Sequence, residues 1–261
     1  MNSLGYKLKK VKKVQPLKKL PQTDQIFQNI SQVKKTYLND NDAAIISIDA
    51  KNAVNIGNFS RGGYSRANVK AMDHDFCNNK LTPFGILDVK SDVMNFYNTT
   101  SKVTADFIVD AIEDYWKISG YQYTKKTLVI LMDNGPENSS RRTRFIYKML
   151  LLADIYKIKI VLAYYPPYHS KYNPVERLWA RLENIWNGSI LDSVETCIKF
   201  MKNLTWKSKS SNVKLVEKEY ETGIKESKIT LDKFEKYITR IDNIEEWALT
   251  ICTIWKKLNI R

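Results

Sequence analysis

Three acidic residues, Asp49, Asp133 and Glu176, each stand where an apolar run gives way to polar, turn-forming sequence. The first ends the run 43–48, the second ends the run 128–132, and the third opens an amphipathic stretch after a proline-rich loop. Short apolar runs bounded by turn residues predict buried strands, and a carboxylate at a strand end reaches the edge where open α/β sheets bind ligands. Converging carboxylates bind hard cations such as Mg²⁺. The pattern therefore predicts a metal-dependent site for phosphodiester chemistry.

Each acidic residue also has a simpler structural explanation. Asp49 and Asp133 suit strand ends and turns, where aspartate accepts hydrogen bonds from backbone amides. Glu176 suits a capping box, because Asn173 is a good N-cap and Pro174 suits the first helical position. The three acids nevertheless fall at defined places in one expected fold: on the first strand, on the fourth strand and on the helix that begins at Glu176. That combination favours a shared site over three separate structural roles.

Apolar periodicity predicts the elements that must position these carboxylates. Strands are expected at about 43–50, 53–59, 83–89, 127–132 and 158–163, with helices at 102–118, 139–156 and from Glu176 onward. Three meandering strands followed by alternating helices and strands are the order of an α/β, RNase H-like core with a mixed five-stranded sheet. Beyond about residue 190 the pattern predicts helices only, over 192–204, 213–240 and 244–258.

The expected organisation has three parts. Residues 1–40 form a basic N-terminal arm or linker, 41–190 the RNase H-like catalytic core, and 191–261 a helical C-terminal region. The arm carries nine lysines against two aspartates, which suits contact with nucleic-acid phosphates, although a solvated tail explains it equally well.

Composition sets further bounds on the class of protein. The formal charge is +14, from 42 Lys and Arg against 28 Asp and Glu, and such a surplus favours polyanionic partners, above all nucleic acid. Hydrophobic residues make up 43%, enough for a buried core. The three cysteines lie far apart without a CxxC pair, as expected of free thiols in a reducing compartment. No apolar run is long enough to cross a membrane, so a cytoplasmic protein is expected.

Several basic residues are candidates for contacting DNA. Arg61, Arg66 and Lys70 surround a predicted Gly-Gly turn, and His169 and Lys171 lie in a loop that mixes aromatic and basic groups. A solvated hairpin is the alternative explanation for the first group.

Other acidic residues have open roles. Glu183 occupies nearly the same angular position as Glu176 two helical turns later, and is the reserve candidate for the third carboxylate. Glu137 fits either a supporting role at the site or a charge near a helix N-terminus. Asp73, His74 and Asp75 could assist at the site or belong to the surface.

Three sequence blocks carry a resemblance to a known family. They are SIDAK at 47–51, MDNGPE at 132–137 and YPPYHSKYNPVERLW at 165–179. Together they resemble the signature blocks of DDE transposases. The third block is similar to the mariner-like superfamily, and closer still to the bacterial insertion-sequence group of Rhodopirellula-type transposases (the ISAzo-thirteen group).

The resemblance implies Mg²⁺-dependent cutting and joining of double-stranded DNA at transposon ends, with Asp49, Asp133 and Glu176 as metal ligands. We expect the two aspartates to share two Mg²⁺ ions, replaceable by Mn²⁺, and Glu176 to complete one of them. The resemblance also implies a homo-oligomer in the bacterial cytosol or nucleoid. Two alternatives stay open: an RNase H-like nuclease without strand transfer, and a DNA-binding remnant without chemistry.

The N-terminal segment departs from the pattern of this family. Its members usually carry a helix-turn-helix DNA-binding region ahead of the catalytic core, whereas only about 40 residues precede the expected core here. Their pattern does not predict two or three helices. The resemblance therefore implies a chain from a 5′-truncated or frameshift-split element.

Overall fold

A computed structural model describes residues 20–66, 68–72, 79–227, 232 and 234–253 of the chain. Its centre is a mixed sheet in the order β10-β11-β6-β5-β1-β3-β4-β9, with the short β2 paired to β3. The strands are β1 (Ala43–Ala50), β2 (Val54–Asn55), β3 (Lys80–Asp88), β4 (Met94–Thr99), β5 (Thr127–Asp133), β6 (Lys159–Tyr165), β9 (Asn212–Val216), β10 (Ile238–Arg240) and β11 (Ala248–Ile251). Strands β7 (Thr205–Trp206) and β8 (Lys209–Ser210) pair separately.

The five central strands form the predicted RNase H-like arrangement. β1 runs antiparallel to β3, and β3 antiparallel to β4, whereas β1, β5 and β6 are parallel. β1 and β5 are buried almost throughout, as expected for parallel strands covered on both faces. Their carboxyl ends therefore meet at one edge of the sheet, where Asp49 and Asp133 stand.

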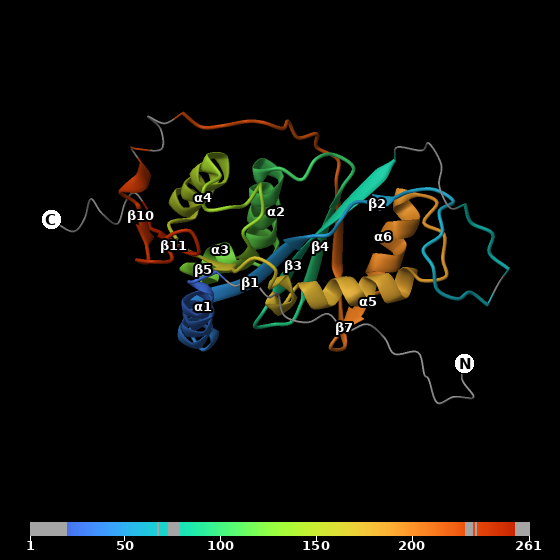
Figure 1. The fold of residues 1–261 in the computed structure, drawn as a ribbon, viewed down its shortest axis with the longest axis horizontal. Helices are drawn as coiled ribbons and strands as arrows, with labels where there is room; N and C mark the ends of the chain where they lie inside the picture. The colour runs from blue at the N-terminus through green and yellow to red at the C-terminus, as the bar shows by residue number, and fades with distance from the viewer. Residues whose placement is uncertain (1–19, 67, 73–78, 228–231, 233, 254–261) are drawn as a thin grey trace.

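Helices cover both faces of the sheet (Figure 1). The helices are α1 (Thr23–Leu38), α2 (Ala105–Ile118), α3 (Tyr121–Thr124), α4 (Thr143–Tyr156), the short 3₁₀ helix η2 (Ser170–Tyr172), α5 (Glu176–Trp186) and α6 (Val194–Lys202). α2 and α4 pack on one face over a core that contains Trp116 and Phe145. The opposite face carries two smaller clusters, one under α1 and the other under α5 and α6.

The segment 1–40, predicted as a basic arm or linker, contains helix α1. Residues 1–19 lie outside the described part, but 23–38 form a helix that buries Ile26 and Ile30 against the sheet. Phe27, Val33 and Tyr37 pack on the same cluster, so the apolar residues recur at helical spacing. The many lysines of this segment obscured that stripe.

The C-terminal prediction is right for α6 but wrong for the residues after it. Instead of helices over 213–240 and 244–258, the described residues form β9 on the β4 edge and the β10–β11 hairpin on the β6 edge. In between, residues 217–227 cross the outer side of α2 and α4 (Figure 1). Residues 254–261 lie outside the described part. The spacing in 244–251 fits a helix, but pairing with the open edge of β6 outweighs it.

The predicted second strand was also misplaced. Only Val54 and Asn55 of the expected 53–59 form a strand, and the next long strand in the sheet after β3 is β4. The sequence of β4 is MNFYNT, in which asparagines interrupt the apolar run, yet all six residues are buried. The asparagine side chains bond to the neighbouring β9, since Asn212 donates to the Asn95 Oδ1 and the Asn98 amide donates to the Lys214 carbonyl.

Candidate functional site

Asp49 and Asp133 stand side by side at the carboxyl edge of the sheet. The parallel register ends with Ser47 opposite Leu131, and two residues further along each strand stand Asp49 and Asp133. Both aspartates line one cavity of about 250 Å³. The rest of its lining comes from Ala50, Phe84, Val103, Ile108 and the turn residues Gly135, Pro136, Glu137 and Asn138. The structure thus brings these two predicted carboxylates together.

Glu176 is placed by a buried contact between β1 and the start of α5. Ser47 is fully buried and donates its hydroxyl to the Asn173 side-chain oxygen, while the hydroxyl oxygen accepts from the Val175 amide at 3.0 Å. The Asn173 amide donates to the Ile48 carbonyl at 3.0 Å. Asn173 is therefore not the predicted helix cap, because its side chain ties α5 to the strand that carries Asp49. We call these three residues the strand–helix clasp: Ser47, Asn173 and Val175.

Trp179, one turn into α5, reaches across to Asp49. Its indole Nε1 donates to the Asp49 Oδ2 at 2.7 Å. Gly85, the partner of Asp49 in β3, makes this approach possible. A Cβ at Gly85 would lie 2.8 Å from the Trp179 Cη2 and 3.0 Å from the Val175 Cγ2. The glycine thus lets α5 lie directly on the sheet and fixes one oxygen of Asp49.

Asp133 is held by the turn that follows β5. The Asn138 amide donates to the Asp133 carbonyl at 3.1 Å and to its Oδ1 at 3.4 Å. The buried Tyr164 hydroxyl in turn donates to the Asn138 carbonyl at 3.0 Å. Gly135 leaves room for this turn, because a Cβ there would lie 2.8 Å from the Asn138 Oδ1.

Electrostatics distinguish Asp49 and Asp133 from the other acidic residues in the described part of the chain. Burial raises the pKa of Asp49 to about 7, the Trp179 hydrogen bond opposes that rise, and the negative charges of Asp133 and Glu176 add to it. Burial also raises the pKa of Asp133, against the lowering effect of its hydrogen bond with Asn138. In the described part of the chain, none of the three carboxylates forms an ion pair with a lysine or arginine. Partly buried acids repelling one another without a countercharge are a donor set suited to a hard cation.

The three side chains do not form a closed ligand set here. Among the described residues, no three Asp, Glu, His or Cys side chains converge closely enough to surround one ion. Glu176 interacts electrostatically with Asp49, but it does not line the cavity shared by the two aspartates. Its side chain would have to turn toward that cavity to share an ion with them.

Glu183, the reserve candidate, is engaged elsewhere. Its two oxygens lie 2.6 Å from the Lys51 Nζ and 2.6 Å from the Arg61 Nη2. Hydrogen bonds from both cations lower its pKa against the effect of burial. Arg61 also lies over the Trp186 ring at 5.4 Å. Glu183, Lys51 and Arg61 therefore form an ion-pair cluster. Arg61 could contact DNA, as predicted, only if its ion pair with Glu183 broke.

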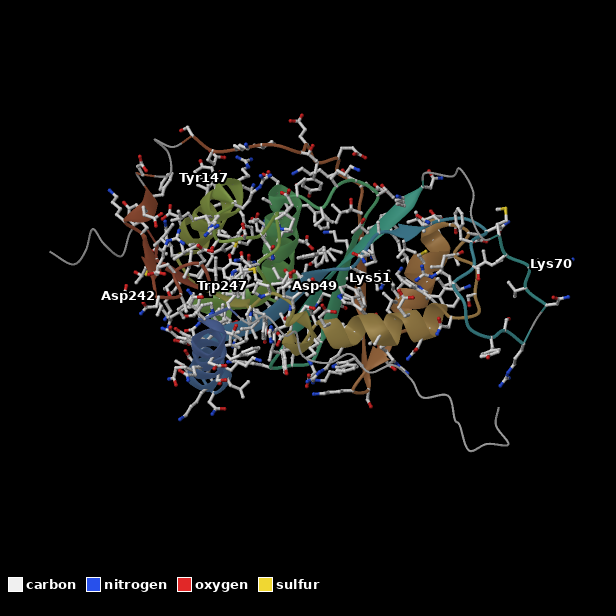
Figure 2. All side chains as sticks on the ribbon, in the orientation of Figure 1. Asp49, Lys51, Lys70, Tyr147, Asp242 and Trp247 are labelled. Atoms are coloured by element: carbon white, nitrogen blue, oxygen red, sulfur yellow. The ribbon has the colours of Figure 1, made fainter. Side chains whose placement is uncertain are left out.

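The other predicted DNA contacts divide into exposed and buried residues. Arg66 and Lys70 are exposed, and Lys70 lies at the far end of the molecule from the sheet (Figure 2). Lys171 is exposed, with its ammonium 5.1 Å from the Tyr172 ring centre. His169 is buried, with its Nδ1 2.8 Å from the Pro167 carbonyl and its ring against Phe27 of α1, so its prediction as a DNA contact does not fit.

Glu137 proves to be a helix-end charge that also borders the cavity. Its Oε2 accepts from the amide of Ala105, the first residue of α2, at 3.3 Å and from Arg142 at 3.1 Å. Asp73, His74 and Asp75 lie outside the described residues.

The sequence analysis missed the residues that hold the carboxylates in place. Ser47, Asn138 and Trp179 looked like ordinary strand, turn and core residues. The available signal was their position, because all three lie within five residues of a predicted carboxylate or inside the third sequence block.

The sheet order and its cavity define an RNase H-like fold of the kind found in transposases. The chain is similar to the Mos1 transposase paired-end complex with left transposon end, with a TM-score of 0.53 and 15% identity over 76% of this chain and 59% of that one. It is also similar to the mariner Mos1 paired-end complex with Mg, with a TM-score of 0.50 and 15% identity over the same shares. The chain therefore spans less than two thirds of the length of these proteins.

The family model for the Rhodopirellula transposase DDE domain matches residues 1–253, and the chain belongs to that family. No curated protein matches it. A helix long and apolar enough to cross a membrane is not found among the described residues.

Proposed function

We propose that this protein cuts DNA strands at transposon ends and transfers them to target DNA, with Asp49, Asp133 and Glu176 as ligands of divalent metal ions. The observation that carries the proposal is the pair of unneutralised aspartates at the ends of adjacent parallel strands, beside a glutamate clasped to the same strand. Membership of a transposase DDE family supports it. So does the similar fold of a Mos1 paired-end complex that was solved with Mg.

The carboxylates fit Mg²⁺, with Mn²⁺ as a substitute, because these cations prefer oxygen ligands and retain positions for water and phosphate. Bound there, such ions would polarise the scissile phosphate and lower the pKa of the attacking water or 3′-hydroxyl.

The protein's own residues act by holding the ligands. Trp179 keeps one oxygen of Asp49 directed, and Asn138 does the same for Asp133. The strand–helix clasp keeps Glu176 on the same side as both. Outer residues that orient ligands in this way govern both metal affinity and activity.

Nicking of a labelled DNA duplex tests the proposal. Wild type and Asp133→Asn are compared in Mg²⁺, Mn²⁺ and EDTA, with circular dichroism to show that both are folded. The proposal expects metal-dependent cutting by the wild type that the variant lacks. Cutting by the folded variant at the wild-type rate contradicts the assignment of the site. Joining of a 3′-hydroxyl end to a second duplex then separates a transposase from a nuclease that only hydrolyses.

A further inference from the structure

The exposed side of α5 carries two arginines without acidic partners among the described residues. Arg177 and Arg181 are both exposed and lie one helical turn apart, about 6 Å along the axis. Within the described part of the chain, neither side chain forms an ion pair. Arg177 directly follows Glu176, so this basic surface borders the carboxylate site.

A third cation, Lys34 of α1, belongs to the same surface. Helix α1 lies beside the start of α5 (Figure 1), where Phe27 packs on Tyr172. The half-buried Lys34 donates to the Tyr165 hydroxyl at 3.0 Å. Burial lowers the pKa of Lys34, and the positive charge of Arg177 lowers it further. Two cations near enough to repel one another, with no carboxylate between them in the described residues, form a site prepared for an anion.

The position of this cluster identifies the anion. Tyr165 ends β6 and pairs with Asp133 across the sheet, so the cations stand at the same edge as the carboxylates. On α2 and α4, by contrast, the basic side chains are paired with acidic ones. Arg144, for example, contacts both Asp106 and Glu226. A cationic surface adjoining a carboxylate site suits a polyanion that must approach negative charge.

We propose that Lys34, Arg177 and Arg181 bind backbone phosphates of the DNA whose strand enters the carboxylate site. This inference rests on the proposed function and adds to it the surface that positions the DNA. Such contacts set register and orientation without reading sequence, and their number determines how steeply binding falls with salt.

The test measures DNA binding by fluorescence anisotropy in EDTA, so that no cutting can occur. The probe is a 30-base-pair duplex of arbitrary sequence, titrated at several salt concentrations. Loss of two phosphate contacts in Arg177→Gln/Arg181→Gln lowers the slope of log K against log salt by about 1.8. Between 50 and 200 mM salt, the wild type should therefore lose about twelvefold more affinity than this variant. Lys34→Gln should lower the slope by about 0.9.

The matched control is Lys199→Gln/Lys202→Gln, which removes two exposed charges from α6. Its slope should equal that of the wild type, and Arg177→Lys/Arg181→Lys should retain the wild-type slope. If Arg177→Gln/Arg181→Gln had the same slope as the control Lys199→Gln/Lys202→Gln, the proposed surface would be overturned, while the carboxylate site would be unaffected. Failure of the folded wild type to bind DNA at all would instead overturn the proposed function itself.

Discussion

Helix α5 carries two glutamates in nearly the same angular position, but the charged groups around them differ. At the first turn, Glu176 lies near Asp49 without a cationic partner in the described part of the chain. Two turns later, Glu183 is held between Lys51 and Arg61. Asp49 is the penultimate residue of β1 and Lys51 directly follows the strand, so one short segment, labelled in Figure 2, supplies both environments.

This difference shows that neighbours, rather than residue type or helical position, decide what a carboxylate does. A glutamate between two cations has its charge neutralised and stabilises the fold. A glutamate beside two other carboxylates raises the electrostatic free energy of the site and is stabilised by a bound cation. Fold stability and catalysis should therefore respond oppositely to changes at the two positions.

The largest expected effect separates these glutamates by activity. Glu176→Gln should lower metal-dependent nicking more than about 100-fold, beyond the usual cost of losing an outer residue that orients a ligand. Glu183→Gln should keep nicking within about threefold of wild type if its role is structural. Nicking rates of both folded variants provide the check. Equal losses of nicking activity in the two variants would contradict the separate roles given to Glu176 and Glu183.

The next effect concerns the two tryptophans of α5. Trp179→Phe removes the donor to Asp49 and should weaken Mn²⁺ binding about 10- to 100-fold, measured by calorimetry. Trp186→Phe is the matched control, because the buried Trp186 Nε1 has no hydrogen-bond partner in the described structure. If both substitutions changed Mn²⁺ affinity alike, general packing rather than the Asp49 hydrogen bond would be responsible.

A smaller effect tests the strand–helix clasp. Ser47→Ala leaves the Val175 amide and the Asn173 oxygen without their buried partner, so it should lower the free energy of unfolding by about 1–3 kcal/mol. Urea unfolding measures this loss. Because Ser47 connects β1 to α5, nicking should fall as well. Unchanged stability would mean that another group or a water replaces the hydroxyl.

The smallest effect is the stability cost at the other end of the helix. Glu183→Gln should lower the free energy of unfolding by about 1 kcal/mol, since Glu183 is about one-third exposed and the pair is partly screened. Glu176→Gln should cost less than this or raise stability, because it removes a repelling charge. Urea unfolding of both variants measures these free energies. A larger loss of stability in Glu176→Gln than in Glu183→Gln would contradict the prediction.

The parallel strands of the central sheet and the aspartates at their ends were predictable because they depend on local signals. Apolar runs locate β1, β5 and β6, and each is followed by turn residues. Parallel pairing then brings Asp49 beside Asp133 with little further information. The carboxylate positions thus follow from strand ends, whose place in a fold of this order is known.

The edges of the sheet and the supporting contacts were not predictable from local pattern. β9, β10 and β11 are short, and their pairing with distant strands decides their conformation. The clasp joins Ser47 to residues more than 120 positions away, and the Asn173 pattern matches a helix cap equally well. Non-local hydrogen bonds of this kind leave no periodic trace in a sequence.

The central claim is that Asp49, Asp133 and Glu176 hold a divalent cation, and calorimetric titration of the protein with Mn²⁺ tests it most directly. The account predicts saturable binding by the wild type that Asp133→Asn abolishes and Glu183→Gln preserves. Binding of equal affinity in the wild type and a folded Asp133→Asn variant would place the metal elsewhere and contradict the account.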